Sequence, residues 1–223
     1  MIILLIITII SIYYICSKIE EKFTNTKDKI IYGLKIIDML FNKHNIYYTV
    51  AYGTLLGTIR HWDMIPWDDD GDINVWRKDY NKIIKLKEEF KENGLIMVEE
   101  WKLIKIYFND TKYPFIDIFI NEDNNGKVIR CMQPYNKGCN SIDRINKWWW
   151  KWLEYPTEWI DKRRRYRFGE IEIWGPKSAE RVLKYWYGEK CLVECKTAEL
   201  NHISGQIIKQ ENVECKNLPK NQL

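Results

Sequence analysis

The stretch that most constrains the fold is residues 47–76, which read YYTVAYGTLLGTIRHWDMIPWDDDGDINVW. Near its end, apolar and polar residues alternate, which predicts a strand with one buried face. Asp70 and Asp72 lie two residues apart at the start of this strand, so both side chains should leave the same face. Asp68 has the same parity, whereas Asp69 should point to the other face. Carboxylates that share a face repel one another unless a cation lies between them, so the pattern predicts a divalent-metal site.

An exposed acidic turn is the alternative, because Asp is a common turn residue and runs of charge usually mark a solvated surface. The flanking residues favour the strand. The apolar run 65–67 precedes the aspartates, and Ile73 and Val75 follow them.

A later carboxylate, Asp117, stands alone in the apolar run FIDIF. A buried carboxylate persists only with a partner charge or a metal, so a salt bridge to a lysine is one interpretation. We expect instead that Asp117 is a third metal ligand, on a strand beside the one that carries Asp70 and Asp72.

Gly53 and Thr54 begin a turn before a short predicted helix over 55–60. A glycine backbone and a hydroxyl can approach a phosphate closely, and the helix N-terminus would direct its N–H groups to the same place. The two residues are weak evidence alone and stronger evidence beside Asp70 and Asp72.

The rest of the chain has the composition of one globular domain. It has 223 residues, of which 30% are charged and 46% hydrophobic, and its net charge of +4 suits an anionic substrate without indicating nucleic acid. The basic run 163–165 beside several tryptophans keeps nucleic-acid binding as an alternative that we do not favour. We expect helices over 27–44, 80–90 and 177–187, and strands over 47–52, 101–108, 113–120 and 168–174.

Residues 1–16 read MIILLIITIISIYYIC and are apolar apart from Thr8 and Ser11. A bilayer span needs about 20 residues, with a lower limit near 17, so a buried core helix is the alternative. We expect a single-pass membrane anchor over 1–17, and the sequence leaves the side of the membrane open.

Six cysteines contain no CxxC pair, and we expect them to be free thiols. Cys191 and Cys195 with His202 form an alternative set of zinc ligands.

Together these residues resemble the LicD/fukutin-related family. The resemblance covers about residues 30–190 and rests on the segments 52–57, 59–61, 65–73 and 116–119. It implies an α+β, nucleotidyltransferase-like fold, with a mixed β-sheet flanked by helices. The expected organisation is an N-terminal membrane helix over 1–17, a catalytic domain over 27–195 and a polar tail over 196–223.

The resemblance also implies an activity and its residues. We expect a membrane-anchored phosphotransferase that uses Mg²⁺ or Mn²⁺ to move a phosphocholine or phosphoalditol group from a CDP-linked donor to a glycan acceptor. Carried over by position, Asp70, Asp72 and Asp117 are the catalytic metal ligands. The residues expected to bind the donor are Gly53, Thr54, Arg60, Asp68 and Lys105.

Two alternatives stay open. One is a nucleotidyltransferase of the same fold that releases pyrophosphate. The other is a catalytically inactive relative that acts as a membrane-bound interaction protein, because Gly71 would loosen the strand between Asp70 and Asp72.

Overall fold

The computed structural model of this protein describes residues 26–100, 103–108, 111–131, 139, 154–195, 197–201 and 206–210. The membrane anchor expected over 1–17 lies outside these residues. Within the described part of the chain, no helix is long and apolar enough to cross a membrane.

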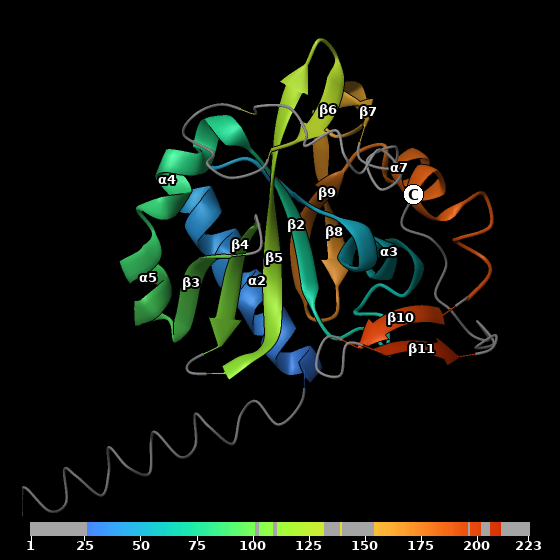
Figure 1. The fold of residues 1–223 in the computed structure, drawn as a ribbon, viewed down its shortest axis with the longest axis horizontal. Coiled ribbons are helices and arrows are strands. Elements are labelled where there is room, and N and C mark those ends of the chain that lie inside the picture. Colours follow the sequence, from blue (N-terminus) through green and yellow to red (C-terminus); the bar gives the residue numbers. More distant parts are fainter. Residues whose placement is uncertain are drawn as a thin grey trace, which may run out of the picture.

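A mixed β-sheet forms the centre of the fold (Figure 1). Among the described residues its strands are β1 (Tyr48–Val50), β2 (Gly71–Trp76), β3 (Leu95–Glu100), β4 (Leu103–Phe108), β5 (Thr111–Asn124), β6 (Lys127–Arg130) and β7 (Tyr155–Pro156). The order is β1-β2-β5-β4-β3, with β6 and β7 continuing from β5. Strand β5 runs parallel to β2 and antiparallel to β4 and β6. With helices around this sheet, the predicted α+β class is confirmed.

Helix α2 (Thr26–Lys43) covers one face of the sheet and lies behind it in Figure 1. Its buried side chains pack against apolar residues of β2 and β5, such as Ile73 and Ile116. Since successive side chains of a strand alternate, the intervening residues face away from α2. In β2 and β5 these intervening residues include Asp72 and Asp117, so the sequence pattern assigns the polar residues to the face that α2 leaves open.

The other described helices surround the sheet. They are α3 (Tyr52–Arg60), α4 (Tyr80–Ile84), α5 (Lys87–Glu92) and α7 (Ala179–Tyr187), with the 3₁₀ turns η1 (Arg77–Asp79) and η4 (Thr157–Trp159). Two hairpins complete the structure, β8 (Arg163–Phe168) with β9 (Ile171–Pro176), and β10 (Thr197–Asn201) with β11 (Gln206–Gln210).

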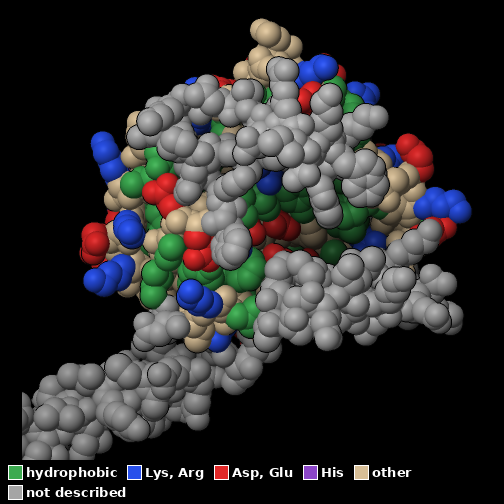
Figure 2. All heavy atoms as spheres, in the orientation of Figure 1, with side chains coloured by type: hydrophobic (Ala, Val, Ile, Leu, Met, Phe, Trp, Pro, Cys, Tyr) green, Lys and Arg blue, Asp and Glu red, His purple; other side chains and the backbone are tan. Residues whose placement is uncertain are grey.

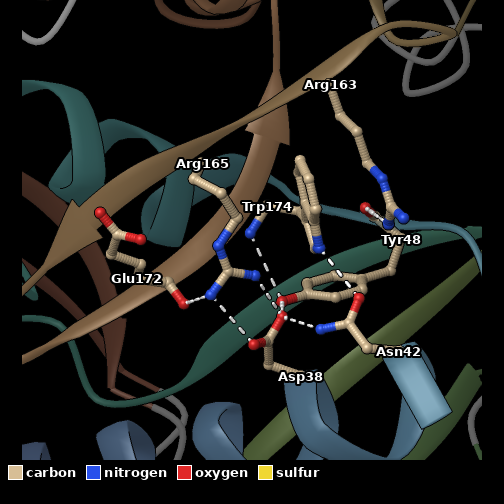
Figure 3. A network of polar contacts seen from close by, with 7 residues as sticks. All are labelled: Asp38, Asn42, Tyr48, Arg163, Arg165, Glu172 and Trp174. Carbon is tan, nitrogen blue, oxygen red and sulfur yellow. Dashed lines mark hydrogen bonds and ion pairs between the residues drawn. The ribbon is translucent and has the colours of Figure 1, made fainter.

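Asp38 of α2 joins three elements through its carboxylate (Figure 3). Arg165 of β8 donates to both carboxylate oxygens, at 2.6 and 3.0 Å, and the Tyr48 hydroxyl of β1 donates at 2.5 Å. Asn42, one turn further along α2, donates at 3.0 Å. The carboxylate therefore fastens the β8–β9 hairpin to α2 and to the edge of the sheet.

We expect Asp38→Ala to lower the free energy of unfolding by about 2 kcal/mol, because Arg165 and Tyr48 lose a shared acceptor. Urea denaturation measures the loss. Glu180→Ala is the control, since Glu180 pairs with Lys184 on the exposed surface of one helix and should matter much less. Equal losses in the two variants would contradict a stabilising role for this network.

The basic run 163–165 forms a strand rather than an exposed rim. The Arg163 guanidinium lies 4.5 Å from the centroid of the Tyr47 ring and 4.3 Å from that of Trp174. Arg165 pairs with Asp38. These intramolecular partners give two of the arginines a role in the fold and weaken the nucleic-acid alternative.

Some elements of the structure differ from those expected. Strand β3 is not predicted, because it is a short, half-exposed edge strand whose apolar pattern is weak. The single helix expected over 80–90 is divided into α4 and α5. The polar tail expected over 196–223 contains the β10–β11 hairpin.

The cysteines also differ from expectation. Cys131 and Cys139 form a disulfide, Cys195 is disulfide-bonded, and Cys191 is a free, buried thiol. Free thiols were therefore a wrong prediction for three of the residues. A sulfur in a disulfide is not a thiolate, so Cys195 does not fit the alternative zinc set.

Candidate active site

The carboxylates of Asp70, Asp72 and Asp117, here called the acidic cluster, come together on the sheet face opposite α2. Asp72 of β2 is in register with Asp117 of β5, and Asp70 immediately precedes β2. One oxygen from each of the three carboxylates lies within 4.8 Å of the other two. Asp72 and Asp117 are only 9% and 8% exposed, which excludes a solvated acidic turn. Figure 2 shows acidic side chains near the middle of this face, among hydrophobic ones.

Burial and mutual repulsion oppose ionisation of the acidic cluster. Burial, and then the charges of Asp70 and Asp117, raise the pKa of Asp72 well above its usual value. Asp117 has a cation beside it, because Lys105 Nζ lies 2.5 Å from Asp117 Oδ1. The same ammonium lies 3.6 Å from the centroid of the Phe115 ring. Asp117 thus forms a salt bridge with a lysine and also belongs to the acidic cluster. The two interpretations made from the sequence, a lysine salt bridge and a metal ligand, therefore do not exclude each other.

Asp68 and Asp69 lie in the loop before β2. One carboxylate oxygen from each lies within 4.8 Å of one from Asp70. The prediction that Asp69 faces away is therefore wrong. Alternation of side chains holds only inside an extended strand, and β2 begins at Gly71.

Gly71 is closely packed rather than loose. A Cβ at this position would lie 3.0 Å from Ile116 Cγ1 and 3.4 Å from Ile30 Cγ2. The missing side chain lets α2 and β5 approach the start of β2. This packing removes the reason for expecting a loosened strand, and with it the main motive for the inactive alternative.

Gly53 and Thr54 connect the start of α3 to the aspartates. A Cβ at Gly53 would lie 2.6 Å from Asp68 Oδ2, so glycine gives the backbone and this carboxylate their close approach. The Thr54 hydroxyl accepts a hydrogen bond from the backbone N–H of Asp72 at 2.8 Å. Thr54 therefore ties α3 to β2, and its expected contact with phosphate stays a prediction.

A cavity of about 670 Å³ opens beside the acidic cluster. Its lining includes Asp70, Asp72, Arg60 and the segment 187–191. Arg60 Nη1 donates to the backbone carbonyls of Cys191 and Glu194, at 3.0 and 3.1 Å. Arg60 thus holds the segment after α7 as a wall of the cavity, and its expected contact with a donor stays a prediction.

His61, next to Arg60, gives the folded protein a specific pH dependence. Burial, and then the charge of Arg60, lower the pKa of His61 to about 4. Above pH 6.5 the imidazole is neutral in both the folded and the unfolded chain. As the pH falls from 6.5 toward 4, the unfolded chain takes up a proton that the folded protein resists, so this group lowers stability.

We expect His61→Gln to make the loss of unfolding free energy between pH 6.5 and 4 shallower than in the wild type. Urea denaturation at a series of pH values measures it. His44→Gln is the control, because it makes the same replacement at a histidine that pairs with Glu89 away from the cavity. An unchanged slope in His61→Gln would contradict the lowered pKa.

Arg130, the last residue of β6, contacts the same face and was not predicted from the sequence. It is a single basic residue at the end of a short strand, which gives no local signal. Only the pairing of β6 with β5, which sets Arg130 opposite Asn121, brings it to this face.

Comparison with known sequences identifies the family. A family model described as LicD/FKTN/FKRP, nucleotidyltransferase domain, matches residues 45–178. The chain belongs to this family. The match includes β1, α3, the acidic cluster and Lys105, while the cavity wall at 187–191 lies beyond it.

The curated relatives match this chain over part of their length. An uncharacterized protein of Rickettsia prowazekii is 29% identical over 150 residues, covering 67% of this chain and 50% of that protein. The lipopolysaccharide cholinephosphotransferase LicD of Haemophilus influenzae is 41% identical over 54 residues, covering 23% of this chain and 20% of its own length. The chain thus spans half or less of the length of these relatives. Among solved structures, lincomycin-bound lincosamide antibiotic adenylyltransferase LnuA gives a TM-score of 0.42 at 12% identity, over 72% of this chain and 94% of that one.

Proposed function

We propose that this LicD-family protein is a metal-dependent phosphotransferase that moves a phosphocholine or phosphoalditol group from a CDP-linked donor to a glycan hydroxyl. The observation that carries the proposal is the acidic cluster, in which one oxygen from each of three carboxylates lies within 4.8 Å of the others. Membership of the family supports the transferase class. The name of the Haemophilus influenzae relative, a cholinephosphotransferase, supports a phosphorylated headgroup.

The residues of the acidic cluster fit Mg²⁺ or Mn²⁺. Both ions prefer hard oxygen ligands, and the cluster offers carboxylates alone. Burial, and then repulsion from Asp70 and Asp117, raise the pKa of Asp72, and a divalent cation would relieve that repulsion. When bound, such an ion polarises the donor phosphates and offsets the charge that develops on the departing CMP.

The protein residues would position the reactants. Asp70, Asp72 and Asp117 hold the ion, and Lys105 orients Asp117 and offsets its charge. The side-chain-free backbone at Gly53 leaves space for the Asp68 carboxylate beside the start of α3. An oxygen of the acceptor hydroxyl forms a bond to phosphorus while the P–O bond to CMP breaks, and CMP keeps that electron pair. We assign the hydroxyl proton to a carboxylate of the site.

The test is product analysis by mass spectrometry with purified protein, Mn²⁺ and a panel of CDP-choline, CDP-ribitol, CDP-glycerol and CTP. Release of CMP from a CDP-linked donor, abolished by EDTA, supports the proposal. Pyrophosphate released from CTP would identify a nucleotidyltransferase. Calorimetry that detects neither metal nor CDP binding would favour the inactive alternative.

We also propose that residues 1–17 anchor the enzyme to a membrane, on the apolar composition of that segment alone. Fractionation of cells that express the full chain tests this. The protein should sediment with membranes and remain there after an alkaline carbonate wash, and release by the wash would contradict an integral anchor.

A further inference from the structure

The guanidinium of Arg130 lies on the same sheet face as the acidic cluster. Side chains in register on antiparallel strands share a face, and Arg130 is in register with Asn121, four residues after Asp117 on β5. The guanidinium carbon lies 3.8 Å from the centroid of the Phe119 ring, between these two positions. The positive charge of Arg130 therefore lies on the same face as the acidic cluster.

The contacts of Arg130 hold the guanidinium without neutralising it. One Nη2–H donates to the Tyr52 hydroxyl, and the Phe119 ring supports the plane of the group. Among the described residues, Arg130 takes part in no ion pair, and its Nε is buried without a hydrogen-bond partner. A buried charged donor without an acceptor is costly, so the fold leaves the charge of this guanidinium incompletely compensated.

Lys105 and Arg60, two other cations near the acidic cluster, already have partners. Lys105 pairs with Asp117 at 2.5 Å. Arg60 donates to the carbonyls of Cys191 and Glu194. Of these cations, Arg130 is the one whose contacts are a phenol and aromatic rings, so its charge is still available to an anion.

Aromatic contacts fix the ring of Tyr52, whose hydroxyl accepts the hydrogen bond from Arg130. Its ring stacks on Trp186, with centroids 4.3 Å apart, and meets the edge of Phe119 at 5.1 Å. Its backbone adopts a φ of +39°, which is strained for a tyrosine. Strain of this kind persists where the surrounding structure fixes a residue for a function, and here it places the phenol under the guanidinium.

We propose that Arg130 binds a phosphate oxygen of the donor diphosphate, on the side of the acidic cluster next to Phe119. The inference rests on the proposed function, because it takes the donor to be a nucleoside diphosphate derivative. The planar fork of arginine suits this role, since it donates two parallel hydrogen bonds to phosphate. Arg130 and the metal ligands would then hold the diphosphate from two directions.

Binding of three probes to the full chain tests this proposal by calorimetry: Mn²⁺ alone, CDP with Mn²⁺, and inorganic pyrophosphate with Mn²⁺. In Arg130→Met we expect the Kd for CDP and for pyrophosphate to rise roughly 10- to 100-fold, because a charged hydrogen bond is lost. The Kd for Mn²⁺ alone should stay the same or fall, since a nearby positive charge is removed.

Arg164→Met is the matched control, because Arg164 also packs on an aromatic ring, that of Tyr166, but lies on the β8–β9 hairpin. It should bind all three probes as the wild type does.

The remaining outcomes separate this inference from the proposed function. If the wild type binds pyrophosphate in an Arg130-dependent way but neither binds CDP nor cleaves CDP-linked donors, the proposed donor is wrong and the phosphate site stands. If Arg130→Met binds both anions like the wild type at an unchanged melting temperature, the inference is overturned. Should Arg130→Met not fold, Arg130→Lys decides: weakened anion binding in this variant supports the role of the arginine fork, and wild-type binding overturns it.

Discussion

Replacing Asp72 with Asn is expected to lower metal-dependent turnover of the CDP-linked donor by on the order of 10³-fold or more. Asp72 is in register with Asp117 and two residues from Asp70, so it lies at the centre of the acidic cluster. Asn keeps the shape of the side chain but loses the charge that Mg²⁺ or Mn²⁺ requires from a ligand. Initial rates at a series of Mn²⁺ concentrations measure both the turnover and the apparent metal affinity.

Glu88→Gln is the control for this experiment, because it also converts a carboxylate to an amide but on the exposed surface of α5. It should retain wild-type turnover. If Asp72→Asn kept the wild-type rate and Mn²⁺ dependence, the acidic cluster would not be the catalytic centre.

The same Asp72→Asn variant should be more stable than the wild type when no metal is present. The pKa of Asp72 is raised by burial and by Asp70 and Asp117, so the folded protein holds a proton that the unfolded chain releases near pH 3.8. The metal-free wild type therefore loses stability as the pH rises from 3.8 through this raised pKa. Asp72→Asn has no carboxylate at this position to ionise, so it should not lose stability in this way. Melting temperatures in EDTA from pH 5 to 8 test this, and a lower melting temperature in the variant would contradict it.

The sequence alone predicted those features of the site that depend on the residue pattern within a single strand. Parity within β2 predicted that Asp70 and Asp72 share a face, and the apolar surroundings of Asp117 predicted a carboxylate with a partner. The register of β2 with β5 then brings Asp72 beside Asp117. A buried polar residue in an apolar strand is expensive enough to signal its role without knowledge of the neighbouring strands.

The parts that the sequence did not predict depend on contacts between distant elements. Arg130 reaches the site only because β6 pairs with the far end of β5. From the sequence, Gly71 suggests a weak point in a strand, yet a Cβ at this position would lie 3.0 Å from Ile116 Cγ1 and 3.4 Å from Ile30 Cγ2 of α2, so the backbone is closely packed there. Asp69 was misplaced because the start of β2 is set by pairing with β5 and not by local pattern. Local periodicity carries no information about any of these contacts.

Lys105→Met is expected to lower the free energy of unfolding of the metal-free protein by about 3–5 kcal/mol, because it leaves Asp117 buried without its cation. The two side chains are only 9% and 11% exposed, so water cannot replace the lost partner well. Saturating Mn²⁺ should reduce the difference, since an ion bound by the acidic cluster compensates the same charge. Urea denaturation in EDTA and in Mn²⁺ measures both values, and Lys184→Met, which removes an exposed lysine paired with Glu180, is the control.

A double-mutant cycle separates loss of the charge pair from loss of packing by the lysine. If the charge of Asp117 is what makes Lys105→Met destabilising, then Lys105→Met/Asp117→Asn should recover most of the lost stability, because no buried charge remains unpaired. Additive losses in the double variant would instead mean that Lys105 stabilises the fold through its contact with the Phe115 ring. Additive losses would also mean that Lys105 does not offset the charge of Asp117. Mn²⁺ should also stabilise Lys105→Met more than it stabilises the wild type. This result, together with recovery of stability in the double variant, would show that the lysine and the metal offset the charge of the same carboxylate.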